Sequence, residues 1–106
     1  MMDVQTSASE YVLKCKVSHG IFSDERGISI ELPDRHVVAF VDRRDIIVSH
    51  DPKLEEEING WVKVAVLILG EDSALVDLPR PALSQGTRLR VPRTMLRLVR
   101  EDVWSR

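Results

Sequence analysis

The sequence contains a single cysteine, Cys15, so no disulfide can form within the chain. That excludes the small secreted scaffolds held by disulfides and favours a reducing compartment, so we expect a cytoplasmic protein. Long hydrophobic runs are also missing, because the longest, Val64 to Leu69, is far shorter than the ~20 residues of a membrane-spanning helix. The first ten residues have no basic or apolar stretch typical of a secretory signal. We therefore expect no membrane partner.

Glycine and aromatic residues are scarce, with five glycines that do not cluster and an aromatic content of 5%. The core must therefore be mostly aliphatic. No glycine-rich phosphate loop, dinucleotide-binding fingerprint or Gly-x-Ser-x-Gly nucleophile motif is present. A chain of 106 residues corresponds to one domain, which we assign to residues 1–106. These absences favour a non-catalytic protein without a cofactor.

Lysine is absent from the last third of the chain. Residues 73–106 contain seven arginines and three acidic residues, whereas residues 1–72 contain eight basic and fourteen acidic residues. Such asymmetry can indicate an anionic partner for the basic part. The alternative is that the two parts pack together and neutralise each other.

Alternation of apolar and polar residues is the main structural signal in the sequence. Period-two patterns or short apolar runs bounded by turn residues predict strands. We expect them at residues 11–17, 28–32, 37–41, 46–48, 61–69, 74–78 and 87–91, followed by a short apolar segment at residues 95–99 that closes the ordered part. The fold class is therefore all-β, either a small barrel or a compact two-sheet sandwich of about six to eight short antiparallel strands.

One stretch, Trp61 to Leu69, is apolar on nearly every position and predicts the most buried strand. A short helical turn is expected just before it. Asp51 can cap such a turn, Pro52 suits its first position, and Asn59-Gly60 can end it.

Aligned with itself, the chain repeats its pattern of residues, which predicts two similar β-units at residues 11–48 and 61–99, linked by residues 49–60. Lys16-Val17 matches Lys63-Val64 and Ile30 to Pro33 matches Val76 to Pro79. Val41 to Arg43 likewise matches Val91 to Arg93. We expect the second unit to supply the centre of the fold and the first to cover it. Residues 1–9 and 101–106 are expected to be loose, with Trp104 able to hold the end in place.

Arginines are the strongest binding candidates, because guanidinium groups bind phosphate or carboxylate in bidentate fashion. The candidate set is Arg43, Arg44, Arg88, Arg90, Arg93 and Arg97. A nucleic-acid site also needs exposed aromatic rings for stacking, and the few aromatics here are expected in the core. The alternative is a solvated arginine face that forms salt bridges with the acidic first part of the chain.

Three histidines, His19, His36 and His50, fall in predicted loops and have no short spacing of the kind common in metal sites. Loops could still converge, so a small metal-dependent enzyme is the least favoured hypothesis. Cys15 lies on the apolar face of its strand, which makes it a structural residue and not a nucleophile.

The expected function is a non-catalytic module that binds another protein or associates with itself. The alternative is a nucleic-acid-binding module that uses the arginine-rich last third. Neither composition nor motifs identify a particular ligand.

Overall fold

The computed structural model describes residues 9–100, which form eight strands and two single turns of 3₁₀ helix. The elements are β1 (Ser9–His19), β2 (Glu25–Leu32), β3 (Arg35–Asp42), η2 (Arg43–Asp45), β4 (Ile46–Ile47), β5 (Glu57–Leu69), β6 (Ser73–Asp77), β7 (Arg88–Pro92), η3 (Arg93–Met95) and β8 (Leu96–Arg100). All recorded strand pairs are antiparallel. The predicted all-β class is confirmed.

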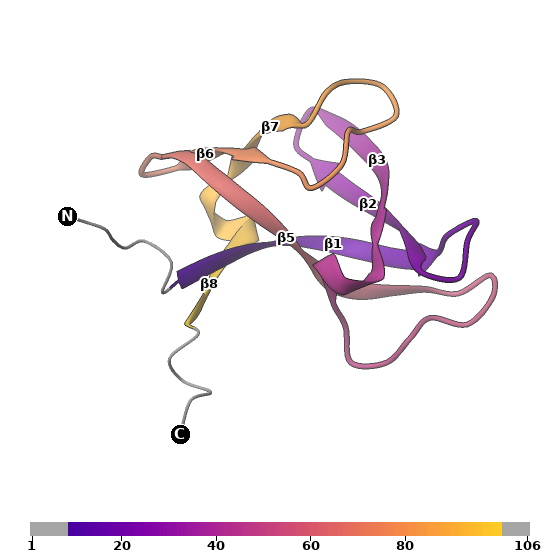
Figure 1. Ribbon diagram of the computed structural model, residues 1–106. Helices are drawn as coiled ribbons and strands as arrows, with labels where there is room; N and C mark the ends of the chain where they lie inside the picture. Colours follow the sequence, from indigo (N-terminus) through magenta and orange to yellow (C-terminus); the bar gives the residue numbers. More distant parts are fainter. Residues whose placement is uncertain (1–8, 101–106) are drawn as a thin grey trace.

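The sheet has the order β3-β2-β1-β5-β6-β7, with β4 beside β5 and β8 beside β1 (Figure 1). It curls into a half-barrel. The loop before β7 reaches across to β3, where Ala82 pairs with Ala39 and the Leu83 amide donates to the Val38 carbonyl at 2.9 Å. This contact ties the loop before β7 to β3, the outer strand at the other end of the sheet.

One apolar cluster fills the curled sheet, and it draws residues from both halves of the chain. Alternation explains its membership, because every second residue of a strand points to the same side. In β1 the inward residues are Leu13, Cys15 and Val17, all buried. The others are Ile28, Ile30, Leu32, Val37, Ala39, Val41, Val62, Ala74, Val76, Leu78, Ala82, Leu89 and Val91. The larger aliphatic side chains each contribute about 1.5–3 kcal/mol on burial.

The order strand, strand, strand, 3₁₀ turn, strand occurs twice, first from β1 to β4 and then from β5 to β8. The last strand of each set pairs with the first strand of the other set, because β4 pairs β5 and β8 pairs β1. Without the second set β4 has no strand to pair with, and without the first set β8 has none. The two sets are therefore interlocked by a reciprocal exchange of their last strands.

The ladders also show which positions correspond. Ile28 lies opposite Ala39 in the first set, and Val76 lies opposite Leu89 in the second. Val76 therefore corresponds to Ile28, whereas the sequence comparison aligned it with Ile30, two residues later. That the two sets arose as a repeat of one sequence stays a prediction.

The prediction of a short helical turn before Trp61 is wrong. Residues 48–56 form a loop in which the Glu56 amide donates to the Lys53 carbonyl at 2.9 Å, closing a tight turn. Glu55 has a φ of 68°, in the left-handed region, which ends any right-handed helix there. Asp51 does not cap a helix, because its carboxylate binds Arg26. β5 begins at Glu57, so the link is also shorter than expected.

The expectation that Trp61 to Leu69 is the most buried strand is also wrong. Only Val62 in this stretch is buried, while Leu67, Ile68 and Leu69 are 42%, 61% and 40% exposed. The second half of β5 runs past the core into a hairpin with β6, and its register shifts between Val66 and Ile68. The first set of strands supplies more of the buried core than the second.

Ser9, expected to be loose, is the first residue of β1 and pairs with Arg100. The other residues expected to be loose, and Trp104, lie outside the described part of the chain. No helix within residues 9–100 is long and apolar enough to cross a membrane.

Candidate functional site

Arg26 is the one charged side chain buried with the core among the described residues, at 3% exposure. It occupies an inward position of β2, opposite Val41. A buried guanidinium needs partners for its N–H groups, because an unpaired charge in the interior costs several kcal/mol. The local structure around Arg26 supplies them from two different loops.

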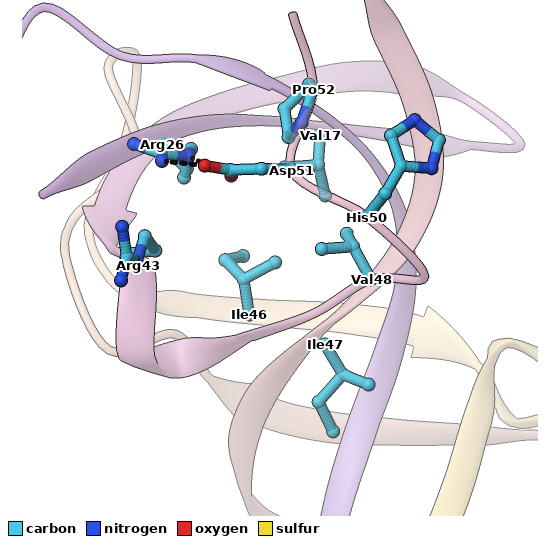
Figure 2. A pocket seen from close by; sticks show the side chains of 9 residues that line it. All are labelled: Val17, Arg26, Arg43, Ile46, Ile47, Val48, His50, Asp51 and Pro52. Carbon is cyan, nitrogen blue, oxygen red and sulfur yellow. Dashed lines mark hydrogen bonds and ion pairs between the residues drawn. The ribbon is translucent and has the colours of Figure 1, made fainter. Parts of the chain in front are cut away.

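Asp51 provides the charged partner. The Arg26 Nε–H donates to Asp51 Oδ1 at 3.0 Å and Nη2 donates to Oδ2 at 2.8 Å, a bidentate pair (Figure 2). Nη1 donates to the carbonyls of Ser23 and Glu25 at 2.9 and 2.7 Å. Arg26 therefore fastens the β1–β2 loop, residues 20–24, to the β4–β5 loop, residues 48–56.

The hydrogen bond from Arg26 lowers the pKa of Asp51 below its usual value, although partial desolvation opposes the shift. The positive charges of Arg26 itself and of Arg43 lower the pKa further, and His19 contributes in the same direction. Asp51 is thus ionised at neutral pH, although 55% of its side chain is exposed. The pair holds the two loops together over the pH range in which the carboxylate keeps its charge.

Each loop has further internal bonds. In the β1–β2 loop, Glu25 Oε1 accepts the Ile21 amide at 2.9 Å, and the Glu25 amide donates to the Phe22 carbonyl at 3.1 Å. In the β4–β5 loop, Glu56 Oε1 accepts the Lys53 amide at 2.7 Å, and this bond lowers the Glu56 pKa most. His50 Nε2 lies 3.7 Å from Glu56 Oε2 and adds to that lowering. Both loops are therefore ordered.

Large apolar side chains project from these two ordered loops. Ile21, Phe22 and Leu54 are 75%, 67% and 78% exposed. We call these three residues the loop-end surface. In Figure 1 both loops project on the right, whereas the β5–β6 turn lies at the left. Exposed apolar groups on loops held by a rigid scaffold are typical of binding sites.

A pocket of about 510 Å³ lies beside the Arg26–Asp51 pair. Figure 2 shows its lining, which is Val17, Arg26, Arg43, Ile46, Ile47, Val48, His50, Asp51 and Pro52. Arg43 lies on the same side of the pocket as the ion pair. The pocket therefore has an apolar floor and a cationic wall, but the Asp51 carboxylate already binds the Arg26 guanidinium.

The structure spreads the six predicted arginines over four elements. Arg43 and Arg44 lie in η2, Arg88 and Arg90 in β7, Arg93 in η3 and Arg97 in β8. It brings Arg88 and Arg90 together on the exposed face of one strand. It does not gather all six on one element.

Several of these arginines have nearby partners. Arg44 lies 3.7 Å from Asp42, and Arg88 lies 3.8 Å from Asp77. The Arg93 Nη1 donates to the Gly70 carbonyl at 2.9 Å. The guanidinium of Arg97 lies 4.7 Å from the centre of the Trp61 ring.

The three histidines do not converge on a metal site. Within residues 9–100, no group of three or more His, Cys, Asp or Glu side chains could hold a metal ion. His19 is the last residue of β1 and His36 lies in β3, so neither lies in a loop as expected, and His36 hydrogen bonds to Ser29. Burial raises the pKa of the Cys15 thiol to about 12, so it is not a nucleophile at neutral pH.

Sequence reasoning missed Arg26, which lies between the strands expected at residues 11–17 and 28–32 and was not a candidate site residue. A signal was present, because Arg26, Ile28 and Ile30 share one face of an alternating strand. An arginine in phase with buried isoleucines indicates a buried ion pair or an end of the core. The sequence could have identified the position, but not its partner 25 residues away.

Comparison with protein-family models, with curated proteins and with solved structures finds no match to this chain.

Proposed function

We propose that this chain is a non-catalytic protein-binding module whose loop-end surface docks into an apolar recess of a partner protein. One observation carries the proposal. Ile21, Phe22 and Leu54 are largely exposed on two loops that the buried Arg26 fastens together. Side chains of this kind on ordered loops lower the free energy of a complex when a partner covers them.

The free energy gained on burying these side chains favours binding to a partner protein. Burying each of these side chains contributes about 1.5–3 kcal/mol. Binding also costs entropy when loops become ordered, and loops that are already held by an ion pair lose less. Glu55 and Asp24 lie in the same two loops, so the partner recess is expected to have a basic rim.

The proposed compartment is reducing, such as the cytoplasm. Its support is the single cysteine, which is free and buried.

The test compares two double variants of matched chemistry in affinity enrichment from cell extract. Phe22→Ser/Leu54→Ser removes apolar groups from the loop-end surface, while Leu67→Ser/Ile68→Ser removes exposed apolar groups from the β5–β6 hairpin. We expect a protein that wild type and the hairpin variant retain and the loop-end variant loses. Calorimetry with that purified protein is expected to show at least a tenfold weaker complex for the loop-end variant.

Equal retention by both variants, or equal loss, contradicts the proposal. Light scattering over a range of concentrations separates a foreign partner from self-association. A rise in mass that the loop-end variant abolishes assigns the surface to a second copy of the chain instead.

A further inference from the structure

The outer face of the central strands is the side of β1, β5 and β8 that points away from the core. Alternation defines it. Leu13, Val62 and Leu96 pack in or against the core, so their neighbours in sequence point outward. This face is separate from the loop-end surface and independent of the function proposed above.

Four cations lie on the outer face: Lys14, Lys16, Lys63 and Arg97. Their places in the ladder bring them together. Lys63 and Arg97 both lie opposite Val12, on its two sides, so the three side chains form one row across β8, β1 and β5. Neighbouring strands are about 4.8 Å apart, which puts the Cα atoms of Lys63 and Arg97 about 10 Å from each other.

Lys14 and Trp61 form the next row, directly opposite each other, with Ile47 of β4 beyond Trp61. The Arg97 guanidinium lies over the Trp61 ring, at 4.7 Å from its centre. This cation–π contact holds the guanidinium in place across the strand. Val12, in the row between Lys63 and Arg97, is only 1% exposed although it points outward.

The charges of this face are uncompensated at close range. Within the described part of the chain, none of the four cations has a carboxylate within ion-pair distance, whereas Arg26, Arg44, Arg80 and Arg88 each do. Acidic residues border the face: Glu10, Glu31 and Glu57 lie at its margins, and Asp45 and Asp77 line a hollow together with Lys63. Four close cations without partners form a site for anions.

Two hollows lie beside Lys14. One, of about 380 Å³, is lined by Lys14, Lys16, Asn59 and Ser29, among others. The other, of about 450 Å³, is lined by Lys14, Asn59, Trp61 and Ile47, among others. Each combines a cation with an amide, and Asn side chains can form hydrogen bonds with base edges.

We propose that the outer face binds single-stranded nucleic acid. Lys14, Lys16 and Lys63 contact successive phosphates, and the guanidinium of Arg97, backed by Trp61, stacks against a base. Bases stack on arginine planes as well as on aromatic rings in proteins that bind single strands. An acidic peptide or an anionic membrane surface also binds cations, but neither has a use for a stacked guanidinium.

The test uses a fluorescent twelve-nucleotide RNA and the corresponding DNA, with binding measured by anisotropy. In a salt titration we expect log K against log salt to have a slope of about −2 to −3, for three or four phosphate contacts. Lys14→Glu/Lys63→Glu is expected to weaken binding at least tenfold. Arg88→Glu/Arg90→Glu makes the same change in net charge on β7 and is expected to change affinity less than about twofold.

Two further variants separate the proposal from general charge attraction and from misfolding. Trp61→Leu keeps every charge and is expected to weaken oligonucleotide binding about tenfold while heparin binding stays unchanged. Glu31→Gln removes a marginal negative charge and is expected to strengthen binding two- to threefold, a gain that misfolding cannot produce.

Three results overturn the proposal. The first is no binding of the oligonucleotides at low salt. The second is an equal loss of affinity in Arg88→Glu/Arg90→Glu and in Lys14→Glu/Lys63→Glu. The third is an affinity for the oligonucleotides that Trp61→Leu leaves unchanged. Binding to phosphatidylserine vesicles or to a polyglutamate peptide without binding to the oligonucleotides assigns the face to one of those partners instead.

Discussion

The hairpins β1–β2 and β5–β6 begin the two sets of strands, and their backbones are held in the same way. The Arg43 amide donates to the Asp24 carbonyl at 2.8 Å, and the Arg93 amide donates to the Asp72 carbonyl at 2.9 Å. Both hairpins also expose large aliphatic residues near their turns. Their ladders differ in that β5–β6 shifts register between Val66 and Ile68, whereas β1–β2 does not.

The side chains differ at one decisive position. Arg26 lies opposite Val41 in the first hairpin, and Ala74 lies opposite Val91 in the second. The arginine holds a second loop, because the chain after β4 folds back as residues 48–56 and brings Asp51 to it. The buried Arg26 therefore ties the first hairpin to a second loop, whereas Ala74, at the same position of the second hairpin, cannot.

Removing the Arg26 side chain is expected to have the largest effect on stability. Arg26→Ala leaves two loop carbonyls and Asp51 without their donor, and it should lower the free energy of unfolding by about 2–3 kcal/mol. Arg93→Ala, in the second hairpin, removes one exposed bond to Gly70 and should cost less than about 1 kcal/mol. Urea denaturation of both variants measures the difference. Similar losses would mean that Arg26 does not set the two hairpins apart.

Gly60 of β5 packs closely against the start of the β4–β5 loop, so a larger residue there is expected to disturb that loop. A Cβ at Gly60 would lie 2.7 Å from Val48 Cγ1 and 2.8 Å from Val17 Cγ2. Gly60→Ala must therefore displace either the start of the loop or the core, at about 1–3 kcal/mol. Gly86→Ala is the control, because a Cβ there meets nothing within 4 Å. Thermal unfolding should show a lower midpoint for Gly60→Ala only, and an unchanged midpoint for both would contradict the close packing.

The smallest effect concerns pH. The pKa of Asp51 is lowered in the folded state, so its contribution to stability is complete above its ordinary pKa of 3.8. That contribution is lost as the pH falls through the lower folded-state value. Wild type should be more stable than Asp51→Asn at pH 7, and the difference should shrink in acid. Urea midpoints at both pH values test this, and a difference that does not change with pH would show that the charge of Asp51 does not contribute.

The strands could be predicted from the sequence because period-two alternation is a local property. Ile28, Ile30 and Leu32 alternate with polar residues whatever the rest of the chain does. The helical turn failed because Asp51, a good cap in isolation, is bound to Arg26 from a distant strand. Local capping preferences are weak beside a bidentate ion pair.

Other features depend on contacts that no local pattern contains. The apolar run after Trp61 does not reveal that β5 extends beyond the core, so Leu67 was expected inside. Trp61 was expected in the core for the same reason, yet it lies under Arg97 on the outer face. Arg97 was identified as a candidate, but the lysines that surround it come from other strands and were not.

The pairing of β8 with β1 also has a consequence for how the chain folds. Ser9 pairs with Arg100, so the first strand of the sheet completes its ladder only with the last one. Contacts between residues so far apart in sequence are formed slowly, because a long loop must close before they stabilise anything. During synthesis, the first half of β1 keeps one edge unpaired until residue 100 has left the ribosome. The exchange that interlocks the two sets of strands thus delays completion of the sheet until both sets have been synthesised.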